Sequence, residues 1–191
     1  MKVDDSGMPE EAYWNSLFDL EAIVDWLDLP KINGATIAEI GCGYGTFTVP
    51  VAKISAGKIF AFDIEPAMIE VARENARKAG LSNVAFSLRD VLEQGTGLEA
   101  GSVDMVLLFN ILHFSGKRVF LEEAARILKE GGIVAIIHWR KDIATPRGPA
   151  LNVRPDQDEI LSAAAGLNFN FHGNGKILEP YHWGMQLVKA L

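Results

Sequence analysis

Residues 36–47 read Thr-Ile-Ala-Glu-Ile-Gly-Cys-Gly-Tyr-Gly-Thr-Phe, which is an apolar run interrupted by one acid and followed by three alternating glycines. Glycine lets a backbone turn sharply and approach a bound group closely, and the first turn of a following helix offers unpaired N–H donors. The stretch therefore predicts a strand, a ligand-binding turn and a helix. Glu39 indicates the kind of ligand, because a carboxylate two residues before Gly41 repels phosphate and attracts an ammonium group.

The glycine spacing separates two classes of cofactor. A dinucleotide fingerprint needs its third glycine at position 46, which is threonine here. The segment instead resembles motif I of the class I S-adenosylmethionine-dependent methyltransferases, (Asp/Glu)-x-Gly-x-Gly-x-Gly. The matching positions are Glu39, Gly41, Gly43 and Gly45, and Cys42 lies inside the loop. The resemblance implies that these residues bind S-adenosyl-L-methionine and release S-adenosyl-L-homocysteine.

Length and charge narrow the class of protein. The chain has 191 residues, which suits one domain over 1–191. Its net charge is -7, whereas a nucleic-acid-binding protein is expected to carry a basic surface. It shows no apolar run long enough for a membrane span and no secretory leader, so we expect no membrane partner. The single cysteine, Cys42, agrees with a cytoplasmic location.

Apolar runs alternate with helical patterns along the chain. Strands are predicted at about 35–40, 58–62, 84–88, 103–109 and 132–138, helices at 46–55, 66–79, 117–128 and 156–165, and two last strands at 168–178 and 182–189. This order predicts an α/β fold, because parallel strands need crossover helices. We expect a three-layer α/β/α sandwich around a mostly parallel seven-stranded sheet, whose last strand is antiparallel and belongs to a C-terminal β-hairpin.

The same order of elements resembles the methyltransferase fold over residues 12–190, in the small-molecule, type 11 form of the domain. The resemblance implies that Asp63 accepts both ribose hydroxyls of the cofactor and that Asp90 takes the adenine amino group. It further places Ile64 and Met68 along the adenine, with Val91 as a backbone donor and Asn110 in the motif IV segment 104–114. Taken alone, Asp63 and Asp90 are equally well explained as a helix-start carboxylate and a loop acid.

Methyl transfer to a small molecule by in-line displacement is the reaction that this resemblance implies. Positioning supplies most of such catalysis, about 7–11 kcal/mol in favourable cases. A general base helps when the nucleophile is a hydroxyl, and His113 and His138 are the candidates at the expected carboxyl edge of the sheet. The alternative for each is a wall residue without a role in proton transfer.

Missing patterns narrow the acceptor. Asn110 is followed by Ile-Leu-His and not by the Pro-Pro-aromatic sequence of the amine-methylating branch, and no Pro-Cys nucleophile appears. No carboxylate and histidine cluster has metal-ligand spacing, so no metal is expected. These absences favour a small-molecule acceptor.

Two segments are expected to surround the acceptor: an N-terminal helical cap over 1–30, with its helix at about 11–29, and a loop over 139–155. Candidate acceptor contacts are Tyr13, Trp14, Arg140, Arg147 and Tyr181. The cations in the loop of this acidic protein suggest an anionic substrate, and the alternative is that they are solvated charges without a ligand. For the N-terminal helix, the alternative is that its aromatic residues only pack on the core. An NAD-dependent oxidoreductase and a non-catalytic partner that retains the fold also stay open, as do the methylated atom and the oligomeric state.

Overall fold

The computed structural model describes residues 7–28, 34–171 and 175–191. The central elements alternate as expected: β1 (Ile37–Ile40), α3 (Thr48–Ser55), β2 (Ile59–Asp63), α4 (Pro66–Lys78), β3 (Val84–Leu88), α5 (Val91–Gln94), β4 (Val103–Phe109), α6 (Lys117–Ile127) and β5 (Leu128–Trp139). They are preceded by α1 (Glu11–Asn15) and α2 (Leu20–Leu27). They are followed by the 3-10 helix η2 (Leu151–Val153), α7 (Gln157–Ala164), β6 (Phe169–Phe171), β7 (Lys176–Leu178) and β8 (His182–Lys189).

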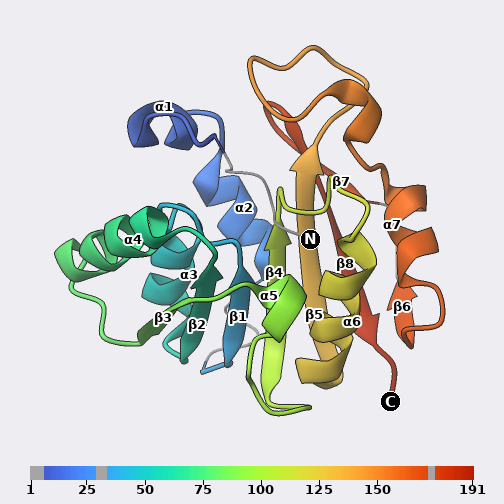
Figure 1. Cartoon of the computed structure of the whole chain (residues 1–191), viewed down its shortest axis with the longest axis horizontal. Coiled ribbons are helices and arrows are strands. Elements are labelled where there is room, and N and C mark those ends of the chain that lie inside the picture. Colours follow the sequence, from blue (N-terminus) through green and yellow to red (C-terminus); the bar gives the residue numbers. More distant parts are fainter. Residues whose placement is uncertain (1–6, 29–33, 172–174) are drawn as a thin grey trace.

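The sheet has the order β3-β2-β1-β4-β5-β8-β6, and β7 pairs with β8 outside this path (Figure 1). Strands β1 to β5 pair in parallel, whereas β8 runs antiparallel to β5, β6 and β7. The predicted fold class is therefore confirmed. The sheet holds eight strands and not seven, because the strand expected over 168–178 forms two short strands, and residues 172–174 between them lie outside the described part.

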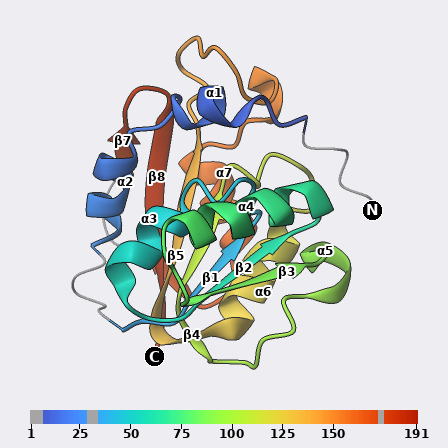
Figure 2. The ribbon, with the colours of Figure 1, turned by 90° about the vertical axis from the view of Figure 1, so that its left-hand side faces the viewer.

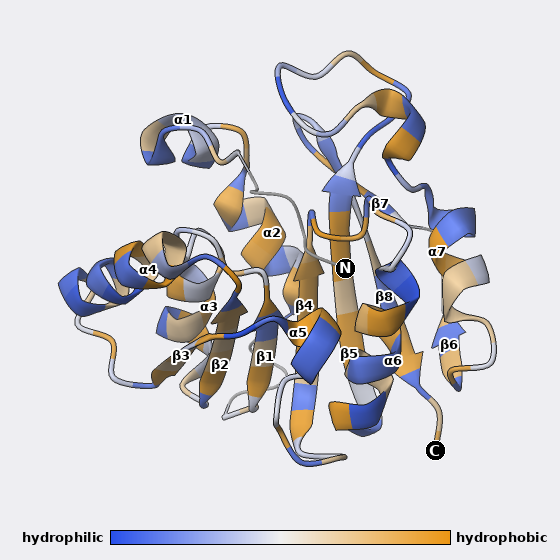
Figure 3. Ribbon diagram, in the orientation of Figure 1, coloured by the Kyte–Doolittle hydropathy of each residue, from blue (hydrophilic) through white to orange (hydrophobic). Residues whose placement is uncertain are grey.

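Helices cover both faces of the sheet and complete three layers (Figure 2). Helices α2, α3 and α4 pack on one face, and α5, α6 and α7 pack on the other. The inner strands are apolar at successive positions and the helices carry polar outer faces (Figure 3). In β4, for example, Val106, Leu107 and Leu108 are all buried, as expected for a parallel strand covered on both sides.

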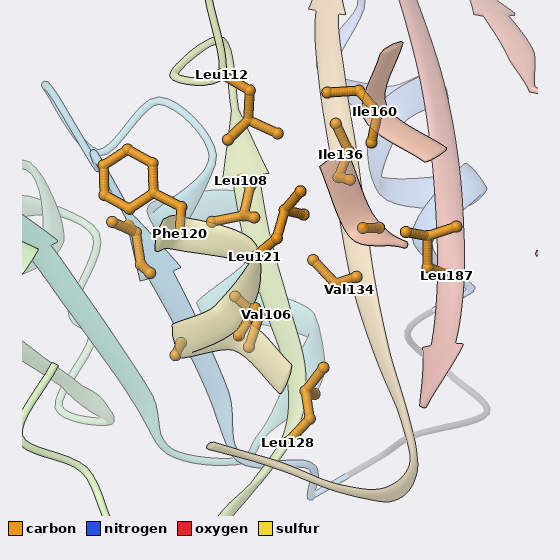
Figure 4. Packing of buried hydrophobic residues seen from close by; sticks show 14 of the residues in the cluster. Val106, Leu108, Leu112, Phe120, Leu121, Leu128, Val134, Ile136, Ile160 and Leu187 are labelled. Carbon is orange, nitrogen blue, oxygen red and sulfur yellow. The ribbon is translucent and has the colours of Figure 1, made fainter. Parts of the chain in front are cut away.

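The larger core cluster lies between the sheet and α6 and α7. Figure 4 shows Leu121 of α6 beside Leu108 of β4, with Ile160 of α7 beside β5. Helix α6 presents this face because its apolar residues recur at helical spacing. This packing holds the carboxyl ends of β4 and β5 in fixed positions.

The N-terminal segment differs from the single helix expected over 11–29. It forms two helices, because the Ser16 hydroxyl donates to the Tyr13 carbonyl after α1, and the Asp19 carboxylate caps the start of α2. Helix α2 buries Ile23 and Val24, whereas α1 buries no residue. Residues 1–6 and 29–30 of the predicted cap lie outside the described residues.

Two predicted boundaries also shift. Helix α3 begins at Thr48, which places Pro50 in the first turn, where a missing N–H costs no helical hydrogen bond. Strand β5 begins at Leu128, because the chain passes from α6 into the strand and Leu128 pairs with Val103 ahead of a register shift. Gly131 makes this path possible with a φ of 73°.

Truncation of Leu121 tests the importance of this core. We expect Leu121→Ala to lower the free energy of unfolding by about 3 kcal/mol, because it removes buried methyl groups and leaves a cavity. The control is Val119→Ala on the same helix, whose side chain is 40% exposed; it should change stability by less than about 0.5 kcal/mol. Urea unfolding followed by circular dichroism measures both, and equal effects would contradict the packing described.

Candidate active site

The glycine turn after β1 is tied to the end of β2. The backbone N–H groups of Gly41 and Cys42 both donate to the Phe62 carbonyl, at 2.8 and 2.9 Å. Gly41 has a φ of 79°, and a Cβ atom there would lie 2.6 Å from Ile111 Cγ2. Only glycine therefore allows the chain to turn this close to the segment after β4.

Asp63, the last residue of β2, joins the turn through its carboxylate. Its Oδ2 accepts from the Gly43 N–H at 2.8 Å and its Oδ1 from the Glu65 N–H at 2.9 Å. Burial raises the pKa of Asp63, and these backbone N–H groups partly oppose the shift. Each carboxylate oxygen has a second lone pair for a further donor.

A cavity of about 690 Å³ opens beside this turn at the carboxyl ends of the parallel strands. Most of the predicted cofactor residues line it: Gly41, Cys42, Gly43, Asp63, Ile64, Met68, Asp90, Val91 and Asn110. They come from the segments that follow β1, β2, β3 and β4, which a parallel sheet brings to one edge. The structure thus gathers residues up to 69 positions apart in the sequence, from Gly41 to Asn110.

Glu39 and Gly45 do not line the cavity. Glu39 is 1% exposed, accepts a hydrogen bond from the Thr48 hydroxyl, and its Oε1 has no partner among the described residues. Burial raises the pKa of Glu39 to about 8. Gly45 packs against Ala72 of α4. Both residues thus pack against helices behind the cavity wall, Glu39 on α3 and Gly45 on α4. A direct contact of Glu39 with a ligand stays a prediction.

Asp90 and Asn110 are the polar residues that the segments after β3 and β4 contribute to the cavity wall. Asp90 Oδ1 accepts from the Leu92 and Glu93 N–H groups and caps α5, so the carboxylate also has the role of a helix start. Asn110 adopts a φ of 58°, and neither polar atom of its amide has a partner among the described residues. A strained residue with an unpartnered buried amide is typical of a ligand-binding position.

The two histidines predicted as bases occupy different environments. His113 lines the cavity, whereas His138 is fully buried and its ring lies 5.8 Å from that of His113, centroid to centroid. Burial lowers the pKa of His113 and holds that of His138 well below its ordinary value. Both imidazoles are therefore neutral at neutral pH, and only His113 can meet a ligand directly.

Of the five predicted acceptor contacts, two line the cavity and three do not. Trp14 and Arg147 line the cavity, but Tyr13, Arg140 and Tyr181 do not. Tyr13 is 43% exposed, Arg140 pairs with Asp142 and Glu179, and Tyr181 stacks on Trp139. The structure therefore does not bring these three side chains to the cavity.

Sequence reasoning missed several wall residues, among them Met8, Phe47, Phe109, Trp139 and Pro149. Met8 reaches the cavity because polar contacts hold the N-terminal segment over the glycine turn. Tyr44 donates to the Pro9 carbonyl at 2.6 Å, and Thr46 donates to the Asn15 side chain at 2.7 Å. Met8, Trp139 and Pro149 belong to the two segments expected to surround the acceptor, and Thr46 was a further signal, because its hydroxyl holds the N-terminal segment.

The described ranges show neither a metal-binding cluster nor a membrane-spanning helix. No group of three or more histidine, cysteine, aspartate or glutamate side chains there could hold a metal ion. Within the same ranges, no helix is long and apolar enough to cross a membrane.

Comparison with known proteins identifies the family. The family model described as a methyltransferase domain matches residues 32–165, so the chain belongs to the methyltransferase domain family. It is an S-adenosylmethionine-dependent class I methyltransferase, and its cofactor is S-adenosylmethionine. The family decides between the cofactor alternatives, against a nicotinamide dehydrogenase.

Individual relatives are more distant. Human EEF1A lysine methyltransferase 2 is 25% identical over 84% of this chain and 70% of its own length. A ribosomal protein L11 methyltransferase from Syntrophomonas wolfei is 30% identical, but the match covers 52% of this chain and 31% of that protein. The crystal structure of a SAM-dependent methyltransferase from Aquifex aeolicus has a TM-score of 0.80 at 24% identity, and covers 95% of this chain and 94% of that one. This last likeness shows a common fold.

The burial of Glu39 generates a pH-dependent prediction. Folding raises the pKa of Glu39 from 4.5 to about 8. The folded state is therefore stabilised by protonation of Glu39. This stabilisation is complete when the pH is below the unfolded pKa of 4.5, and it is lost as the pH rises through the folded pKa. The wild type should therefore lose at most about 1.4 kcal/mol per pH unit across this window through Glu39. Glu39→Gln should raise the melting temperature at about pH 8 and have little effect near pH 4.

The control for this comparison is Glu21→Gln, on the exposed face of α2. Thermal unfolding of the three proteins at several pH values measures the difference. A Glu39→Gln variant that is destabilised equally at all pH values would contradict a neutral, buried Glu39.

Proposed function

We propose that the cavity binds S-adenosylmethionine along the wall from Gly41 to Val91 and places a small-molecule acceptor in the remaining half, beside Trp14, His113 and Arg147. The main support for this proposal is the hydrogen bond that joins the Asp63 carboxylate to the glycine turn. The two Asp63 oxygens, each already oriented by one backbone N–H, suit the two hydroxyls of a ribose.

The other wall residues fit the rest of the cofactor. In this proposal, Ile64 and Met68 offer apolar surface for the adenine, and Asp90 and the Val91 N–H serve as the acceptor and the donor for its polar edge; all four residues line the cavity. The glycine turn and the unpartnered Asn110 amide suit the aminocarboxypropyl end, which carries both charges. Burial of Glu39 beneath the turn adds a carboxyl group that ionises when a cation approaches.

The bound cofactor supplies a methyl group on a positively charged sulfur. The protein contributes orientation and exclusion of water, because the acceptor half is bounded by Trp14, Trp139 and Pro149. Positioning of this kind supplies a large share of the rate enhancement of a bimolecular transfer. We therefore assign His113 an assisting role and assign His138 no contact with the acceptor.

An anionic acceptor is favoured by the distribution of cations. Lys141 pairs with Asp156 and Glu159, and Arg154 donates to the carbonyls of Pro149, Arg140 and Arg147. Arg89 on the cavity wall likewise donates to the carbonyls of Gly95 and Gln94. Arg147 donates to the Gly7 carbonyl at the cavity rim. Its guanidinium retains donors to bind a carboxylate or a similar anion.

A protein acceptor is the second candidate, and the name of the human relative, a lysine methyltransferase, supports it. A lysine side chain would have to enter beside Arg147, which repels its charge. We therefore place a small molecule first, and the cytoplasm as its location.

Substitution of Asp63 tests the cofactor assignment. Asp63→Ala should weaken binding of S-adenosylhomocysteine at least tenfold, because it removes the acceptors for the ribose hydroxyls. Asp142→Ala, on the exposed loop after β5, serves as the control and should leave the affinity unchanged. Isothermal titration calorimetry measures both, and full affinity of Asp63→Ala would refute the assigned site.

Substitution of Arg147 tests the acceptor assignment. In protein saturated with S-adenosylhomocysteine, Arg147→Met should weaken binding of benzoate about tenfold or more, because it removes a charged hydrogen-bond donor. Arg140→Met removes a cation of the same loop that does not line the cavity, and should have no effect. Equal losses in the two variants would show that the loop attracts anions only through its net charge.

A further inference from the structure

Two neighbouring imidazoles near the carboxyl ends of β4 and β5 have buried nitrogens without a hydrogen bond of normal length and direction to any described residue. His113 Nδ1 and both ring nitrogens of His138 are buried, and none of these atoms has a partner among the described residues. An unsatisfied buried polar atom destabilises the folded state. Such atoms are uncommon in folded proteins and call for an explanation.

The charges around the acceptor half argue against a cationic amine. The carboxylates on the cavity wall, Asp63, Glu65 and Asp90, follow β2 and β3 on the side assigned to the cofactor. The wall residues contributed by segments 7–18, 110–114 and 139–149 include Arg147 and no acid. An ammonium group in this half would meet a guanidinium and no counter-charge.

The same half favours an aromatic ring. Trp14, Phe109 and Trp139 line it, and Trp14 lies edge-on to Trp139 at 6.2 Å between ring centroids. Aromatic side chains in such arrangements contact a planar ring well. A phenolic hydroxyl on that ring is a good hydrogen-bond donor, and a neutral imidazole nitrogen accepts it.

We propose that the methyl acceptor is a phenol whose hydroxyl is bound and deprotonated by His113, and that His138 is a positioning residue which acts through His113. This inference rests on the proposed function, because it concerns the acceptor half of the same cavity. It explains why a neutral histidine lines a wall that contains no acid on that side.

The proposed step balances in atoms and charge. The phenolic oxygen forms a bond to the methyl carbon while the carbon–sulfur bond breaks and its electron pair passes to sulfur. The hydroxyl proton moves to the His113 imidazole and later to solvent. The products are an aryl methyl ether, S-adenosylhomocysteine and a proton.

The groups that face the two imidazoles keep them neutral. Burial lowers the pKa of His113, and the backbone of Asn110 opposes this shift in part. Burial lowers the pKa of His138, and Arg154 adds to this as a positive charge, whereas His182 is itself buried and neutral, with a pKa of about 3. Asp63 and Asp90 line the cavity from β2 and β3, and Arg147 lines it from the loop. His138 thus meets His113 as a neutral ring in a T-shaped contact, and in the proposal this contact orients His113.

Nitrogen-15 NMR of the histidine side chains tests the proposal in protein saturated with S-adenosylhomocysteine. Phenol should shift the His113 nitrogen signals saturably. Anisole, which lacks the hydroxyl, and benzylammonium, which is cationic, should bind at least threefold more weakly. Absence of a His113 shift with phenol, or an equal shift with benzylammonium, would overturn the proposal.

Variants separate positioning from folding. His138→Phe should weaken phenol binding at least threefold and change the tautomer ratio of His113, while S-adenosylhomocysteine binds as in the wild type. His182→Phe is the matched control, because His182 is equally buried but its ring stacks on Phe18, and the tautomer ratio of His113 should stay unchanged.

If His138→Phe does not fold, His138→Gln replaces it, with the same expected changes. Unchanged tautomer ratio and phenol affinity in the folded variant would overturn the role of His138. Failure of the wild type to bind S-adenosylhomocysteine would refute the proposed function itself, which distinguishes the two failures.

Discussion

The hydrogen bonds that join the glycine turn to the end of β2 are the constraint on which the site depends. Two N–H groups of the turn share the Phe62 carbonyl, and the Gly43 N–H binds the Asp63 carboxylate. The turn therefore cannot move without moving Asp63. Because β1 and β2 are neighbours in parallel, the ends of both strands present their backbone and side chains to one cavity.

The charges of the site follow from burial as much as from residue type. Glu39 and Asp63 are acids whose pKa values burial raises, and His113 and His138 are bases whose pKa values burial lowers. All four groups are shifted toward their neutral forms. A site of this kind suits a ligand that brings its own charge, and the family's cofactor carries a sulfonium, an ammonium and a carboxylate.

Local sequence signals predicted the central elements well. Strands β3 and β4 have the expected limits, and the apolar run of β4 is typical of a parallel strand covered on both faces. The wall from Gly41 to Val91 could be predicted because each part lies directly after a strand. The sequence could not predict that Met8 and Trp139 line the cavity and that Arg140 does not. These positions depend on how the N-terminal segment and the loop after β5 meet across the cavity.

A crystal structure of the protein with bound S-adenosylhomocysteine would show whether the cavity holds the cofactor as proposed. Both ribose hydroxyls should contact Asp63, the adenine should lie against Ile64 and Met68 with its amino group at Asp90, and the sulfur should face the half of the cavity lined by His113. A nucleoside that binds elsewhere, or a ribose that makes no contact with Asp63, would contradict the proposal.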